Sequence, residues 1–168
     1  MAKDVQKMEA AIPKKYGADA VEIPGSRAVL DDLEKGGAKW AIVTSGTRGL
    51  ISGWLDIMQL AHPENLIAAE DVKNGKPDPE GYLLGYRKLG LADEGARSAV
   101  VFEDAPAGVR AGKAAGFKVV ALATTHSVKQ IREAGADWIV KDMRSVSVKS
   151  IDRKTGRTTL EISNALVK

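Results

Sequence analysis

The sequence predicts a doubly wound α/β fold built on a mostly parallel sheet, and three observations carry this prediction. Short apolar runs alternate with helix-like segments along the 168 residues. These runs are rich in Val, Ile and Ala and lack a polar alternation, as is typical of strands covered on both faces. Most of them end in polar or turn-forming residues that can begin the next helix. A chain of this length suits one domain with a hydrophobic core.

Composition restricts the classes of function. A hydrophobic content of 44% and a charged content of 28% are ordinary for a globular protein. The chain has no apolar run long enough to span a membrane and no apolar signal peptide at residues 1–6, so we expect a cytoplasmic protein. The 25 basic and 22 acidic residues are spread without a basic block, which does not favour a nucleic-acid partner. The absence of cysteine excludes disulfides and thiolate metal sites.

The first part of the chain is predicted to be helical. Residues 5–16 form a short amphipathic helix that Pro13 and Gly17 are expected to stop. A linker follows, and Ser26 is expected to cap a second helix, which the glycine pair at 36–37 ends.

The strand predicted over residues 39–43 ends in Thr44, Ser45 and Gly46. Hydroxyl groups and a glycine at the carboxyl end of a strand, directly before a helix, can donate hydrogen bonds to a phosphate. The alternative is that these residues serve only for capping and tight turn geometry. The helix that follows carries apolar residues at core spacing over residues 51–58.

Residues 65–70 are predicted to form a third strand, and Lys76 follows in a loop. Pro77 holds Lys76 in an extended conformation. Asp78 is expected to cap a helix that has proline in its first position and runs to Leu89. A lysine fixed before a helix is well placed to offer a point charge to a phosphate, although most lysines are simply solvated.

An apolar run over residues 98–102 ends in two adjacent carboxylates, Glu103 and Asp104. The carboxyl ends of strands are where open α/β sheets bind their ligands. Neighbouring carboxylates repel each other and lose solvation on burial, and Mg²⁺ would relieve both effects because it takes oxygen ligands. The alternative is an exposed acidic loop beside a helix N-cap. Pro106 and the small residues after it predict a helix packed closely on the sheet.

The remaining chain continues the alternation. Residues 118–123 and 137–140 are predicted strands, and Ser127 is expected to cap the helix between them. His126 follows the first of these strands, but a single loop histidine is more often structural than catalytic. Residues 145–164 alternate apolar and polar side chains around a polar turn, which predicts a β-hairpin.

Three short segments, taken in chain order, resemble the second, third and fourth motifs of haloacid dehalogenase-like (HAD) phosphatases. They are Val43-Thr44-Ser45-Gly46, Gly75-Lys76-Pro77 and Phe102-Glu103-Asp104-Ala105-Pro106-Ala107-Gly108. Segments 40–48, 101–108 and 111–116 are similar to the branch of glycerol-phosphate and 2-deoxyglucose-6-phosphate phosphatases. The resemblance extends over most of the chain, and it implies the Rossmannoid three-layer fold of that family.

The resemblance implies a Mg²⁺-dependent phosphatase of small polyol or sugar phosphates such as glycerol 3-phosphate. Thr44 would bind the phosphoryl group with the main chain of residues 45–46, and Lys76 would neutralise charge on the phosphoryl oxygens. Asp104 would bind Mg²⁺, and Glu103 would support or join its ligand set. In the family, an aspartate attacks phosphorus and forms an aspartyl-phosphate that water hydrolyses.

The chain departs from the family before the second motif. The family's first motif, Asp-x-Asp-Gly-Thr after an apolar strand, supplies the nucleophile, and no such motif precedes Thr44. Asp4, Asp19 and the pair at 31–32 are the aspartates in that part of the chain, and none of them follows an apolar strand. We therefore expect a truncated fold that lacks the nucleophilic Asp and is inactive alone.

We interpret residues 1–23 as a cap-domain remnant and linker, 24–144 as the HAD-like core and 145–168 as a C-terminal hairpin and tail. Two hypotheses stay open: the chain is the C-terminal part of a small-molecule phosphatase, or it is a non-catalytic module. Such a module would bind phosphate or Mg²⁺, or a partner that supplies the missing central strand. A generic nucleotide-binding domain is less well supported because no glycine-rich phosphate loop follows a strand.

Overall fold

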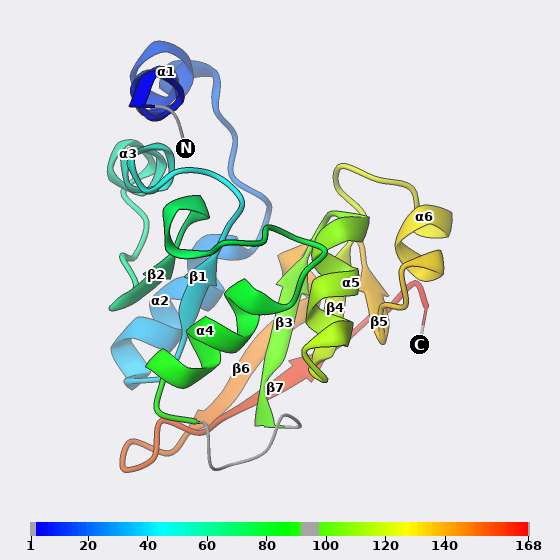
Figure 1. The fold of residues 1–168 in the computed structure, drawn as a ribbon. Helices are drawn as coiled ribbons and strands as arrows, with labels where there is room; N and C mark the ends of the chain where they lie inside the picture. Colours follow the sequence, from blue (N-terminus) through cyan, green and yellow to red (C-terminus); the bar gives the residue numbers. More distant parts are fainter. Residues whose placement is uncertain (1–2, 92–97, 168) are drawn as a thin grey trace.

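The computed structural model describes residues 3–91 and 98–167 (Figure 1). The first of these ranges contains α1 (Lys3–Tyr16), η1 (Gly17–Asp19), α2 (Ser26–Gly36), β1 (Ala41–Val43), α3 (Arg48–Met58), β2 (Asn65–Ile67), η2 (Ala69–Asp71) and α4 (Glu80–Lys88). The second contains β3 (Val100–Glu103), α5 (Pro106–Ala114), β4 (Lys118–Leu122), α6 (Val128–Glu133), β5 (Trp138–Val140), η4 (Met143–Ser145), β6 (Val146–Ile151) and β7 (Thr158–Ile162). Within these two ranges no helix combines the length and apolar character needed to cross a bilayer.

The strands form two parallel sheets and one antiparallel hairpin. β1 pairs with β2, with Val43 opposite Ile67. β4 lies between β3 and β5, with Val120 opposite both Phe102 and Trp138. β6 and β7 form the predicted hairpin. These pairings confirm the α/β fold, but among the described residues β1 and β3 do not pair, so the parallel sheet is divided between them.

Hydrophobic cores cover both faces of the three-stranded sheet. The larger core lies between this sheet and α4, α5 and α6, and includes Tyr82, Val109, Val119 and Ile131. The smaller core lies on the opposite face, where Val120 and its neighbours pack against residues that include Ile162 of β7. The helices, sheet and hairpin therefore form the layers visible in Figure 1.

Glycines allow the closest helix packing. α1 lies on α3, where Gly49 and Gly53 leave room for Ala10 and Pro13. The sequence predicted that Pro13 would help to stop α1. Instead, the helix continues to Tyr16, and the proline ring is buried against α3. The packing of this ring offsets the hydrogen bond that an interior proline removes.

Three predicted helix or strand ends are placed differently in the structure. α2 is preceded by Gly25, whose φ of 88° favours glycine, so Ser26 is its first residue and not its cap. α4 begins at Glu80, and Asp78 accepts a hydrogen bond from the Glu80 amide at 2.9 Å. The strand predicted over 65–70 ends at Ile67, because the Asp71 carboxylate binds the amide at position 68 and turns the chain into η2.

Candidate phosphate and metal site

One lysine connects the carboxyl ends of the two parallel sheets. Lys76 lies in the loop before α4, and its Nζ donates a 3.0 Å hydrogen bond to the carbonyl of Val43, the last residue of β1. The same ammonium group forms a salt bridge with Glu103, the last residue of β3. The structure therefore brings together the three segments that the sequence singled out.

Glu103 is almost completely buried and is held from several directions. Its carboxylate accepts hydrogen bonds from Lys76 and from the Tyr82 hydroxyl. It also accepts from the Asp104 amide at 3.2 Å. An added Cβ on Gly108 would stand 2.0 Å from the carboxyl carbon, so a glycine is required where α5 passes this group. The charge of Glu103 is thus compensated within the protein, which suits a positioning role.

Tyr82 is a site residue that the sequence reasoning missed. It lies in the first turn of α4 and is buried beside Glu103. Burial, followed by the negative charge and hydrogen bond of Glu103, raises its pKa above the ordinary value of 10.0. The phenol therefore stays protonated and donates to the carboxylate. Helical spacing places Tyr82 on the core side, but no sequence signal shows that its hydroxyl reaches the end of β3.

In the turn between β1 and α3, neither Thr44 nor Ser45 caps the helix. Thr47 is the N-cap residue, and its buried side chain accepts from the Leu50 amide. Thr44 and Ser45 stand before this cap. The Thr44 hydroxyl accepts a 3.1 Å hydrogen bond from the Gly46 amide, and Ser45 is exposed. Of the alternative expected from sequence, capping by Thr44 or Ser45 is not seen, whereas the hydrogen bond between Thr44 and Gly46 is a tight-turn contact.

Carboxylates already bind the first amides of α3. The Thr47 amide donates to Glu9 of α1 at 2.9 Å. The Arg48 amide donates to both carboxylate oxygens of Glu70 at 3.1 Å. Anionic groups are favoured at this end of a helix by the exposed N–H groups and the helix dipole.

Asp104 is partly exposed and has different partners from Glu103. Its Oδ2 accepts a 2.6 Å hydrogen bond from the Thr125 hydroxyl. His126 Nδ1 lies 3.2 Å from the Asp104 main-chain carbonyl. The N-cap of α5 is Ala105, so Asp104 does not cap that helix. Thr125 follows β4, and its contact with the neighbouring strand end could have been suspected from the parallel order of strands.

The donors suit a hard cation only in part. Among residues 3–91 and 98–167, no group of three or more acidic or histidine side chains could hold a metal ion. Mg²⁺ binds through one or two protein carboxylates and completes its ligands with water and substrate phosphate oxygens. The accessible carboxylate of Asp104 fits this pattern, with Glu103 behind it as a support.

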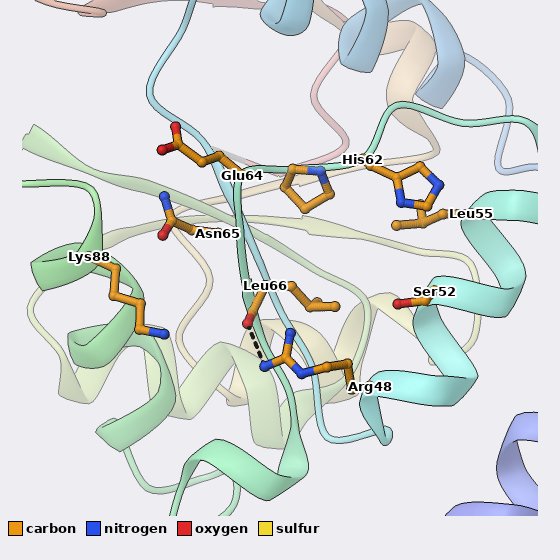
Figure 2. A pocket seen from close by; sticks show the side chains of 9 residues that line it. Arg48, Ser52, Leu55, His62, Glu64, Asn65, Leu66 and Lys88 are labelled. Carbon is orange, nitrogen blue, oxygen red and sulfur yellow. Dashed lines mark hydrogen bonds between the residues drawn. The ribbon is translucent and has the colours of Figure 1, made fainter.

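A shallow polar hollow lies elsewhere, at the outer edge of β2, and none of the candidate site residues lines it. Figure 2 shows Arg48, His62 and Lys88 around it. The Arg48 guanidinium donates to the Leu66 carbonyl at 3.1 Å and also binds Asp71, so its charge is compensated. This hollow is distinct from the candidate site.

Comparisons with known proteins found relatives of this chain. Residues 2–122 match the family described as haloacid dehalogenase-like hydrolase. Glycerol-1-phosphate phosphohydrolase 1 of Saccharomyces cerevisiae is 45% identical over 163 residues, covering 93% of this chain and 64% of the yeast protein. 2-Deoxyglucose-6-phosphate phosphatase 1 of the same yeast is 34% identical, covering 99% of this chain and 72% of that protein.

A solved hydrolase from Pseudomonas syringae has a TM-score of 0.71 at 26% identity, over 80% of this chain and 62% of that one. The chain thus spans somewhat less than two thirds of both the glycerol-1-phosphate phosphohydrolase and the Pseudomonas hydrolase. The family match covers well over half of the present sequence. The chain belongs to the haloacid dehalogenase-like hydrolase family.

Proposed function

We propose that this chain forms the phosphate-holding and metal-holding part of a phosphatase for small phosphorylated polyols or sugars. The observation that carries the proposal is the position of Lys76, whose ammonium group joins the strand end before Thr44 to the strand end before Asp104. The names of the yeast relatives support glycerol phosphate as the first substrate to test, followed by 2-deoxyglucose 6-phosphate.

Each residue has a defined task in the proposed site. The Thr44 hydroxyl and the main chain of residues 45–46 would hold the phosphoryl oxygens, and Lys76 would balance their charge. Asp104 would hold Mg²⁺, which supplies charge neutralisation at the phosphoryl group when it is bound. Glu103 would keep Lys76 and the start of α5 in place, and its buried contacts support this role.

We propose that none of the aspartates before Thr44 supplies the attacking carboxylate. The family resemblance implies transfer of the phosphoryl group to an aspartate, followed by attack of water on the aspartyl-phosphate. Asp4 lies in α1, Asp19 in η1 and the pair at 31–32 in α2, and none of these follows a strand. We therefore expect the chain alone to release no phosphate.

The test is a chimera in which this chain replaces the matching region of yeast glycerol-1-phosphate phosphohydrolase 1. We expect Mg²⁺-dependent release of phosphate from glycerol phosphate by the chimera and none by the chain alone. Asp104→Asn should reduce the rate by about 10²-fold or more, because a charged metal ligand is lost. Asp32→Asn, at an exposed position of α2, is the matched control and should leave the rate unchanged.

Two results would contradict the proposal. A folded chimera without phosphatase activity would show that residues of this chain cannot support the reaction, and would favour a non-catalytic phosphate-binding module. A chimera whose activity survives Asp104→Asn would show that the metal is held elsewhere. Circular dichroism of each variant separates loss of activity from loss of folding.

A further inference from the structure

Residues 72–79 form the loop that carries Lys76 from η2 to α4, and one carboxylate holds the first half of this loop. Glu80 accepts hydrogen bonds from the Lys73 amide at 2.8 Å and from the Asn74 amide at 2.9 Å. These two contacts keep the pKa of Glu80 below its ordinary value of 4.5, so the group is charged at neutral pH. The position of Lys76 therefore depends in part on the contacts of a single charged side chain.

The Asn74 side chain takes part in this anchor. Its Nδ2 donates to Glu80 Oε2 at 3.2 Å, and the same oxygen accepts from the Asn74 main-chain amide. Because both nitrogens bind one atom, the side-chain amide is turned toward the residue's own main-chain nitrogen and away from the peptide bond that follows. Asn74 is exposed, so these contacts stand in water, where local hydrogen bonds open readily.

Gly75 makes the peptide bond after Asn74 accessible. It is exposed, and a Cβ at this position would have no heavy atom within 4 Å apart from those of its two chain neighbours. Among the described residues, the Gly75 amide donates no hydrogen bond to another group. Glycine also adopts more backbone conformations than other residues, so its nitrogen can rotate toward the preceding side chain. The Gly75 nitrogen is thus an available nucleophile beside a carboxamide.

These two residues can react with each other without an enzyme. The Gly75 nitrogen attacks Cγ of Asn74, the new C–N bond closes a succinimide ring, and the Cγ–Nδ2 bond breaks. The amide proton of Gly75 leaves with Nδ2 as ammonia. Water then opens the ring at either carbonyl, which gives aspartate or isoaspartate at position 74. No atom is oxidised or reduced, and water is the only co-reactant.

The product would oppose the anchor of the loop. A carboxylate at position 74 donates no hydrogen bond to Glu80 and adds a negative charge beside Oε2, where like charges repel each other. Glu80 would then release the amides of residues 73 and 74. In the isoaspartate product the main chain also gains a methylene group, which shifts Lys76 relative to the strand ends that it joins.

We propose that Asn74 is a site of spontaneous deamidation that Glu80 restrains, and that the modification loosens the loop that positions Lys76. Three observations carry this proposal together: the Asn-Gly step, its exposure, and the hydrogen bonds that hold the Asn74 side chain back. The modification is not a step of the proposed phosphatase reaction. It converts the chain irreversibly into an aged form with a different charge in this loop.

The chain supplies two internal controls for the test. Asn65 and Asn164 precede Leu66 and Ala165, whose side chains hinder attack by the following nitrogen. The intact chain is incubated in mildly alkaline buffer, and peptide mass spectrometry measures the gain of about 1 Da at each asparagine. We expect this gain to be at least about tenfold faster at Asn74 than at Asn164, which is also exposed. Equal rates at the three positions, or no gain at Asn74, would overturn the proposal.

A pair of variants tests the nucleophile and the restraint. Gly75→Ala should slow the mass gain at Asn74 at least about fivefold, because a side chain hinders the nitrogen and the open surroundings leave room for it. Glu80→Gln should speed the gain at least about threefold, because a neutral amide holds the Asn74 nitrogens less firmly than a carboxylate does. An unchanged rate in Gly75→Ala would overturn the assigned nucleophile, and an unchanged rate in Glu80→Gln would overturn the restraint.

Hydrogen exchange measures the effect on the loop. Asn74→Asp reproduces the aspartate product, whereas Asn74→Ala removes the side-chain donor without adding a charge. We expect exchange of the Lys73 amide to become at least about tenfold faster in Asn74→Asp and clearly less so in Asn74→Ala. An unchanged rate in Asn74→Asp would overturn the loosening of the loop, and equal rates in the two variants would overturn the part played by charge repulsion. Because none of these measurements uses a phosphate ester, they stand or fall independently of the proposed function.

Discussion

β1 and β4 are apolar strands of similar composition, yet they differ sharply in burial. In β4, which has a strand on each side, Val119, Val120 and Ala121 are 0% exposed. In β1, which has a strand on one side only, all three residues are half-buried. Similar apolar content therefore does not by itself decide how deeply a strand is buried: β4 has a strand at both edges, whereas β1 has one.

The two sheets also contribute different chemistry to the candidate site. The three-stranded sheet presents Glu103 and Asp104, whereas the two-stranded sheet presents the turn that begins at Thr44. Lys76 and Tyr82, from the loop before α4 and from α4 itself, connect them. The site therefore depends on how firmly the less buried sheet is held against the well-buried one.

The largest expected effect compares the middle residues of two strands. Ile139→Ala in β5 should lower the free energy of unfolding by about 2–5 kcal/mol, because Ile139 is completely buried and leaves a cavity. Ile42→Ala in β1 should cost clearly less, about 1 kcal/mol, because part of the side chain is exposed already. Urea denaturation measures both, and equal losses would contradict the difference between the sheets.

The next effect concerns the contact between α5 and Glu103. Gly108→Ala should destabilise by about 1–3 kcal/mol, since the new methyl group overlaps the Glu103 carboxylate. Gly75→Ala is the matched control, because nothing lies within 4 Å of a Cβ at that position. Thermal unfolding followed by circular dichroism compares them, and an unchanged melting temperature for Gly108→Ala would show that Glu103 is free to move.

A smaller effect is expected from the hydroxyl group that binds Glu103. Tyr82→Phe should cost about 1.5 kcal/mol, the value of a hydrogen bond to a charged group. Because the pKa of Tyr82 is raised in the folded state, its stabilisation is complete below the ordinary value of 10.0 and declines as pH rises above it. Between pH 8 and pH 11, the free energy of unfolding should fall less in Tyr82→Phe than in the unchanged chain. Identical falls would argue against this contact.

The smallest effect concerns an acid in the well-buried sheet. Burial alone would raise the pKa of Asp137, but hydrogen bonds from Lys113, the Val119 amide and Lys118 together lower it below 3.8. The Asp137 carboxylate therefore stabilises the fold at pH values above its ordinary pKa of 3.8. This contribution is lost as the pH falls below 3.8, toward the lowered pKa of the folded state. Asp137→Asn should cost about 0.5–1 kcal/mol at pH 7 and less at pH 2.5. A cost that does not depend on pH would contradict the assigned charge contacts.

The sequence predicted the alternation of elements and the hairpin, because buried strands and turn residues are local signals. The family resemblance, and not these signals, implied that Thr44, Lys76 and Asp104 share one site, and this stays a prediction. The sequence did not predict Tyr82 or Thr125 in the site. Their contacts depend on how neighbouring elements are placed in space, and a helical tyrosine or a loop threonine carries no local mark of its partner.

The predicted end of β2 was also wrong. The strand stops at Ile67, because the Asp71 carboxylate binds the amide of residue 68. That contact involves Asp71, a residue that sequence patterns assign only to a polar loop. Among the described residues β1 and β3 belong to different sheets, while the expected loss of a central strand and the cap and core boundaries stay predictions.

The central claim is that both sheets contribute to one phosphate site, and a titration of the ¹⁵N-labelled chain with inorganic phosphate and Mg²⁺ tests it directly. The account predicts that the amides of Ser45 and Gly46 after β1 and those of Asp104 and Ala105 after β3 shift together, with one dissociation constant. A response confined to one sheet, or two unrelated dissociation constants, would contradict a shared site.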